Sequence, residues 1–136
     1  MSEAAVISRG ASTGFMSGQG SVLIIDDEAA IRESLQTLLE LEGYDVGVAA
    51  SGEEGLARLG DRPFDLVLLD LALPDRNGID LLPEIRAIDP QLSIIVITGH
   101  YKEMPADTEA KIHRWIPKPF NIPTIREAVM SSIEKV

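Results

Sequence analysis

The chain has 136 residues, of which 45% are hydrophobic and 25% are charged, and these values fit one folded domain with a single apolar core. Its formal charge of −10 disfavours broad electrostatic binding to nucleic acid or to anionic lipid. Cysteine is absent, which excludes disulfides and thiolate chemistry. We therefore expect a cytoplasmic protein that neither contacts nucleic acid directly nor enters a membrane.

The N-terminal residues differ in composition from the rest of the chain. They are rich in Ser, Gly and Ala and lack the apolar run of a secretory signal. We expect a flexible tail over residues 1–20 and one folded domain over residues 21–136. From Ser21 onward, short apolar runs alternate with amphipathic segments, which is typical of a parallel sheet flanked by helices.

The domain begins with a predicted strand, helix and second strand. Residues 22–25 form an uninterrupted apolar run, which suits a strand buried on both faces. Apolar residues recur at helical spacing from residue 31 to residue 39, so we expect a helix that ends near Gly43. Residues 44–48 then indicate a weaker strand.

A second helix and a third strand follow. Ser51 and Glu54 have the spacing of a capping box, which predicts a short helix through about Leu59. The apolar run 64–69 predicts the third strand, and turn-forming residues follow it in 74–78.

The remaining elements complete a repeating order of strand and helix. Pro83 should keep the start of the third helix close to itself. Residues 92–97 and 115–116 predict the fourth and fifth strands, whereas residues 100–113 show no clear pattern. Asn121 is expected to cap a last helix.

Right-handed crossovers would arrange these elements as a doubly wound, five-stranded parallel sheet with flanking helices. Ligands bind such sheets at the carboxyl ends of the strands, and polar residues follow the predicted strands at this edge. These residues are Asp26, Asp27, Asp70, Thr98 and Lys118. Each alone is a common turn former or helix cap, but their convergence on one edge predicts a functional site.

Three neighbouring carboxylates predict a cation site, because two unit charges about 4 Å apart repel by about 4 kcal/mol at an effective dielectric of 20. Oxygen ligands without nearby His or Cys favour Mg²⁺. A carboxylate in such a site can attack phosphorus and form an aspartyl phosphate, while the metal and a lysine neutralise charge. Thr98 can then donate a hydrogen bond to a phosphoryl oxygen.

Four motifs occur in a fixed order along the chain. They are Asp26-Asp27-Glu28, Asp70 with Pro74 and Gly78 in a D-x-x-x-P-x-x-x-G pattern, Thr98, and Lys118-Pro119-Phe120. Together these motifs resemble the CheY-like receiver domain of bacterial two-component response regulators. The resemblance covers residues 21–136 and implies a flavodoxin-like (βα)5 fold.

The resemblance implies that Asp70 is the phosphoacceptor and that Asp27 is a direct Mg²⁺ ligand. Asp26 would act largely through water, and the backbone carbonyl of Ala72 would supply another ligand. The phosphoryl donor would be a histidine kinase or a histidine phosphotransfer protein. The domain would assist its own phosphotransfer and dephosphorylation without being an enzyme in its own right.

The resemblance also implies roles for residues on the last two strands. Lys118 would pair with the phosphoryl group, Thr98 would be the switch hydroxyl, and a cis bond would precede Pro119. Trp115 would occupy the switch aromatic position, where the family more often has Tyr or Phe. The interval from Thr98 to Lys118 is shorter than usual in the family, so we expect a short or irregular fourth helix.

Two other functions are considered. A haloacid dehalogenase-type phosphatase expects a second aspartate two residues after its nucleophile, whereas this chain has Ala72. A receiver-like interaction module without phosphorylation is disfavoured because the whole motif set is present, although an altered fourth helix would affect switching. The downstream protein target, the presence of an effector domain, and the choice between monomer and homodimer are left open by the sequence.

Overall fold

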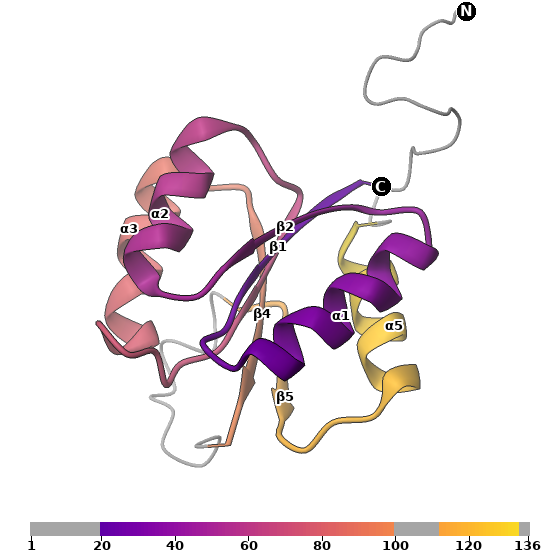
Figure 1. Cartoon of the computed structure of the whole chain (residues 1–136). Coiled ribbons are helices and arrows are strands. Elements are labelled where there is room, and N and C mark those ends of the chain that lie inside the picture. The colour runs from indigo at the N-terminus through magenta and orange to yellow at the C-terminus, as the bar shows by residue number, and fades with distance from the viewer. Residues whose placement is uncertain (1–19, 100–111, 134–136) are drawn as a thin grey trace, which may run out of the picture.

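The computed structural model describes residues 20–99 and 112–133. Within these ranges, five strands form one parallel sheet in the order β2-β1-β3-β4-β5 (Figure 1). The strands are β1 (Ser21–Ile25), β2 (Asp45–Ala49), β3 (Leu66–Leu69), β4 (Ser93–Thr98) and β5 (Arg114–Pro117). The predicted doubly wound, five-stranded parallel sheet is therefore confirmed.

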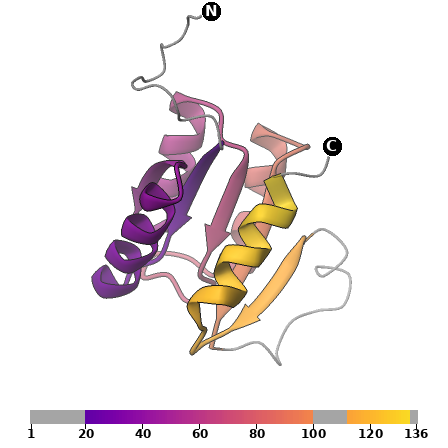
Figure 2. The ribbon, with the colours of Figure 1, turned by 90° about the vertical axis from the view of Figure 1, so that its right-hand side faces the viewer.

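Helices cover both faces of the sheet. They are α1 (Ala29–Leu41), α2 (Gly52–Asp61), α3 (Gly78–Ile88) and α5 (Ile122–Ile133). Helices α2 and α3 lie on one face, and α1 and α5 lie on the other (Figures 1 and 2). None of the helices in the described ranges has the length and apolar character needed to cross a membrane. The expected fourth helix, and the expected tail apart from Gly20, fall outside the described residues.

The sheet packs against its helices through two apolar cores, one on each face. In β1, Leu23 and Ile25 belong to the core beneath α2 and α3, whereas Val22 and Ile24 belong to the core beneath α1 and α5. This division follows from the alternation of strand side chains between the two faces. Burial on both faces explains why the sequence of β1 is an unbroken apolar run.

The predicted cap of α2 is confirmed in part. The Ser51 hydroxyl oxygen accepts the Glu54 N–H at 3.1 Å, as a capping box requires. The return hydrogen bond differs from the expected one, because the Glu54 carboxylate accepts the N–H of Ala50 at 2.8 Å, one residue before the cap. The helix continues to Asp61, beyond its expected end.

The third strand and third helix also differ slightly from expectation. Strand β3 begins at Leu66, because Phe64 is buried in the core without pairing in the strand ladder. Helix α3 begins at Gly78, so Pro83 lies inside the helix and not near its start. These shifts do not move the carboxyl ends of the strands, where the functional site is predicted.

Candidate functional site

Three carboxylates meet at the carboxyl edge of the sheet. Asp26 and Asp27 follow β1 and Asp70 follows β3, and the structure brings one oxygen of each within 4.8 Å of the others. The strands are neighbours, and the Asp70 N–H donates to the carbonyl of Ile25 at 2.9 Å. Asp26 and Asp70 are only 3% and 4% exposed, whereas Asp27 is exposed. The predicted cluster is therefore present, with two buried members and one facing solvent.

Lys118 supplies positive charge to this cluster. Its Nζ atom lies 3.2 Å from Oδ2 of Asp26 and 3.2 Å from Oδ2 of Asp70. A third carboxylate, that of Glu28, lies closer, at 2.8 Å. Burial lowers the pKa of Lys118, but the hydrogen bond to Glu28 and the two buried carboxylates outweigh burial and raise this pKa above its ordinary value. Lys118 is therefore charged at neutral pH.

The backbone fixes the position of Lys118 relative to the sheet. Strand β5 ends at Pro117, and the Lys118 N–H donates to the carbonyl of Thr98 at 3.0 Å. The Lys118–Pro119 peptide bond is cis, as the resemblance implied. The pairing of β4 with β5 therefore holds the backbone of Lys118 beside the end of β4.

The electrostatics of the cluster call for additional positive charge. Burial raises the pKa of the Asp26 carboxyl, and the charge of Asp70 acts in the same direction. The Glu28 N–H, which donates to Asp26 Oδ1 at 2.9 Å, and the ammonium of Lys118 oppose this rise without cancelling it. Carboxylates at such separations repel by about 3 to 4 kcal/mol per pair at an effective dielectric of 20. Three hard oxygen donors facing one ammonium fit a divalent cation such as Mg²⁺.

A tight loop follows Asp70 and leads into α3. The Ala72 N–H donates to Asp70 Oδ1 at 3.1 Å, and the Gly78 N–H donates to the Leu71 carbonyl at 2.9 Å. A Cβ atom on Gly78 would lie 2.7 Å from Cα of Leu71 and 3.1 Å from the Asp70 carbonyl oxygen. The glycine of the D-x-x-x-P-x-x-x-G motif is therefore required for close backbone packing beside Asp70.

Thr98 and Trp115 lie on neighbouring strands. Thr98 is the last residue of β4 and is fully buried, while Trp115 is half-buried and packs against the core beneath α2 and α3. In the β4–β5 register, Val96 faces Trp115 and belongs to the same core. Because Thr98 is two residues from Val96, its side chain projects to the same face of the sheet as Trp115.

Two features of the site were not predicted. Glu28 directly follows the aspartate pair, and its contact with a lysine 90 residues away was not expected from the sequence. The contacts from Asp75 and Arg76, in the loop after Asp70, to the start of α2 were also not expected. In each case the polar residue type was the only available signal.

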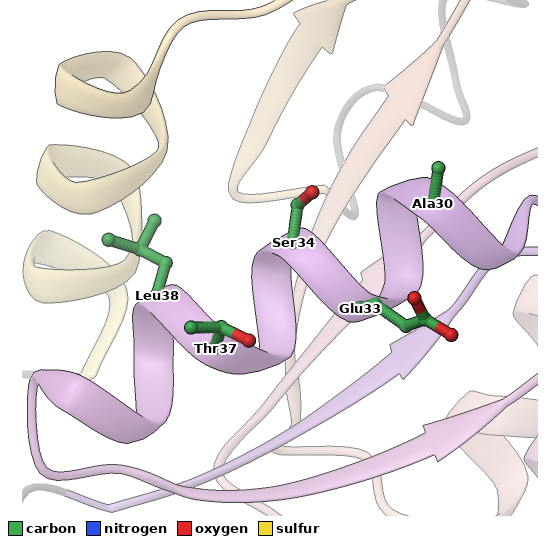
Figure 3. Close-up of a pocket in the computed structure, with 5 residues that line it drawn as sticks. All are labelled: Ala30, Glu33, Ser34, Thr37 and Leu38. Atoms are coloured by element: carbon green, nitrogen blue, oxygen red, sulfur yellow. The ribbon is translucent and has the colours of Figure 1, made fainter.

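A shallow hollow lies along α1, and none of the residues of the acidic edge lines it. Its lining residues are Ala30, Glu33, Ser34, Thr37 and Leu38. Figure 3 shows these side chains along the helix, with Leu38 directed towards α5. The lining contains one carboxylate and no cationic side chain, so it offers neither a carboxylate cluster for a metal nor a positive charge for phosphate. The acidic edge is therefore the candidate functional site.

Comparisons with known proteins relate this arrangement to one family. The response regulator receiver domain family matches residues 22–130. The transcriptional regulatory protein CpxR of Klebsiella pneumoniae is 39% identical over 102 residues, which are 74% of this chain and 43% of CpxR. The chain thus spans less than half the length of this relative.

Solved structures share both fold and sequence similarity with the chain. A response regulator receiver domain protein from Clostridium thermocellum has a TM-score of 0.77 and 29% identity, and the match covers 85% of this chain and 94% of that one. The response regulator TrrA of Thermotoga maritima, solved in complex with Mg²⁺ and BeF, has a TM-score of 0.75 and 31% identity over 82% of this chain and 97% of its own. The family match covers most of the chain and includes every residue of the acidic edge. This chain therefore belongs to the response regulator receiver domains, the phosphoacceptor modules of two-component signal transduction.

Proposed function

We propose that Asp70 accepts the phosphoryl group, at a Mg²⁺ site that it shares with Asp26 and Asp27. The observation that carries this proposal is the environment of the Asp70 carboxylate. It is almost completely buried, its Oδ2 atom lies 3.2 Å from the Lys118 ammonium, and two further carboxylates adjoin it. A nucleophile between a cationic partner and a metal-binding cluster suits transfer of a phosphoryl group.

In the proposed reaction, a carboxylate oxygen of Asp70 attacks the phosphorus of a phosphohistidine. The new O–P bond forms as the P–N bond breaks, and the electron pair of that bond leaves with the donor imidazole, which is then protonated. Lys118 neutralises charge on the transferred group, and because its pKa is raised it is protonated before the transfer begins. Because the raised pKa also makes Lys118 a poor acid, we assign it no proton transfer.

Mg²⁺ fits this site through the oxygen donors already described. Asp27, exposed to solvent, would bind it directly together with Asp70, and Asp26 would act largely through water. The backbone carbonyl of Ala72 would be a further ligand. The bound ion would neutralise the negative charge of the transferring phosphoryl group. The complex of TrrA with Mg²⁺ and BeF supports this proposal by similarity.

The proposed donor is a histidine kinase or a histidine phosphotransfer protein. The similar protein TrrA has been solved in complex with the histidine kinase ThkA, and a CheY from Borrelia burgdorferi has been solved with CheX. Several longer relatives are transcriptional regulators, so we propose a protein as the downstream target. Direct contact of this acidic domain with nucleic acid is not part of the proposal, and a cytoplasmic location stays a prediction.

We propose that phosphorylation is transmitted through Thr98 and Trp115. Their side chains project to the same face of the sheet, and Trp115 packs against the core beneath α2 and α3. If the Thr98 hydroxyl moves towards the phosphoryl group, it leaves space into which the indole can turn. The signal would then pass from the acidic edge to β5.

Replacement of Asp70 tests the proposed function. With Mg²⁺ and acetyl phosphate, intact mass measurement should show one added phosphoryl group on the wild type and none on Asp70→Asn. The variant should keep its fold, and its urea midpoint without Mg²⁺ should equal or exceed that of the wild type because one repelling charge is removed. Asp80→Asn, an exposed change on α3, is the matched control and should be labelled normally. Undiminished labelling of Asp70→Asn would overturn the assignment, and turnover of diverse phosphate esters would favour a hydrolase.

A further inference from the structure

The loop after Asp70 is joined at its tip to helix α2. The two carboxylate oxygens of Asp75 accept the first two N–H groups of the helix, from Gly52 at 2.9 Å and from Glu53 at 3.0 Å. Helix N-terminal N–H groups have no partner within the helix, and the positive end of the helix dipole favours a carboxylate there. Asp75 follows these residues by 23 and 22 positions, so it connects two separate parts of the fold.

Arg76 makes a second connection at the same place. Its guanidinium lies 3.1 Å from Glu53 of α2 and also pairs with Glu84 of α3. Packing around Gly52 is close, because an added Cβ would lie 3.4 Å from the Arg76 side chain and 3.3 Å from that of Leu81. The tip of the loop is thus held between the two helices.

The base of the loop is held by other contacts. Residues Ala72 and Asn77 form an isolated antiparallel bridge, and the Ala72 N–H donates to Asp70. The path of the backbone from Ala72 to Asn77 therefore depends on contacts at the base of the loop and on contacts at its tip. Asp75 accepts hydrogen bonds from the backbone of α2, whereas Arg76 contacts side chains of α2 and α3.

We propose that Asp75 is a positioning residue for phosphorylation, which holds the loop so that the Ala72 carbonyl is presented to the metal. This inference rests on the proposed function of the acidic edge. Asp75 itself is exposed and belongs to neither the carboxylate cluster nor the Lys118 contacts. It acts through the backbone of the loop that begins at Asp70.

The chain offers a control that separates loop positioning from the stability of α2. Ser51 caps the same helix from its own segment, by accepting the Glu54 N–H at 3.1 Å. Ser51→Ala therefore weakens the start of α2 without releasing the loop. Asp75→Asn removes one carboxylate oxygen, so one of the bonds from the loop to the helix is lost.

The test is calorimetric titration of the full chain with Mg²⁺, together with amide exchange measured by NMR. Asp75→Asn should raise the Mg²⁺ dissociation constant about fivefold, the factor that corresponds to one ordinary hydrogen bond. Amide exchange at Gly52 or Glu53 should become faster in the same variant. Ser51→Ala should expose the Glu54 amide to exchange but change the dissociation constant less than about twofold. Arg76→Gln, which weakens the second connection, should also raise the dissociation constant.

The outcomes are distinguishable. If the wild type and all variants fail to bind Mg²⁺, the proposed metal site is wrong and the inference fails with it. If the wild type binds Mg²⁺ and Asp75→Asn binds equally well, the positioning role alone is wrong. If Asp75→Asn and Ser51→Ala weakened Mg²⁺ binding equally, the positioning role would also be wrong, because the effect would then come from the start of α2 and not from the loop.

Discussion

Replacement of Lys118 by alanine should affect both the stability of the domain and the rate of phosphoryl transfer, and the two effects can be measured separately. The change removes the ammonium that lies 3.2 Å from both Asp26 and Asp70 while leaving those carboxylates in place. The metal ligands remain, so Mg²⁺ should still bind. Phosphoryl transfer from acetyl phosphate should become much slower, because one neutralising charge is lost.

The effect on stability follows from burial. Loss of one partner from a buried ion pair costs about 3 to 5 kcal/mol, because the remaining charge is left uncompensated. The Lys118 side chain is 18% exposed, and its contact with Glu28 is open to solvent, so part of the cost is screened. We therefore expect Lys118→Ala to lower the free energy of unfolding by about 2 to 3 kcal/mol without Mg²⁺. Mg²⁺ should narrow the difference from wild type, because the cation supplies the missing positive charge.

Urea unfolding with and without Mg²⁺ measures the stability term, and the rate of mass increase with acetyl phosphate measures transfer. Arg126→Ala is the matched control, because it breaks an exposed ion pair, with Glu42 at 3.0 Å, and should cost at most about 1 kcal/mol. If Lys118→Ala loses no more stability than Arg126→Ala, the electrostatic reasoning is wrong. Transfer at the wild-type rate would show that Lys118 takes no part in phosphorylation.

Three further predictions concern the loop, its acid sensitivity and the proposed switch. In urea unfolding, Gly78→Ala should lower the free energy of unfolding by about 1 to 3 kcal/mol, because the added Cβ would lie too close to the backbone of Leu71. Gly60→Ala, which adds a Cβ in open space, should raise the free energy of unfolding by up to about 1 kcal/mol. If both variants were stabilised equally, the close packing at Gly78 would be contradicted. Two N–H groups of α2 lower the pKa of Asp75, so its contribution to stability is present above its ordinary value of 3.8 and is lost as the pH falls through the lower folded-state value. The urea midpoint of wild type should therefore fall more steeply than that of Asp75→Asn in this acid range, and parallel profiles would argue against the contact. Mg²⁺ with beryllofluoride should change the fluorescence emission of Trp115, and Thr98→Ala should reduce this change. If fluorine NMR shows that both proteins bind beryllofluoride equally and their emission changes are the same, Thr98 does not connect the acidic edge to Trp115.

The location of the site could be predicted from the sequence because of a simple property of parallel sheets. Strands that run in the same direction end at one edge, so a polar residue after each apolar run is brought to that edge. Asp26, Asp70 and Lys118 were placed together on this basis, and their side chains do meet. Errors of one or two residues in the ends of the strands did not matter, because the polar residues themselves mark where the apolar runs stop.

Local hydrogen bonding was predictable to a similar degree. The bond from Glu54 to Ser51 joins residues three apart, and the geometry of a helix start brings such residues together. The bond from Ala50 to the Glu54 carboxylate was not predicted, because it depends on the path of the chain as it leaves β2. The sequence pattern thus specified the start of α2 but not the full set of its partners.

Contacts between distant elements were decided only by the tertiary structure. Glu28 contacts Lys118 across 90 residues, because the carboxyl ends of β1 and β5 lie at the same edge of the sheet. Asp75 contacts Gly52 across 23 residues, because the loop after β3 lies against the start of α2. No periodicity in the sequence encodes these meetings, since they depend on how helices and strands pack against one another. The sequence by itself determined the fold class, the acidic edge and the residue types that gather there. The packing of α2 against the loop decided which residues hold that edge in place.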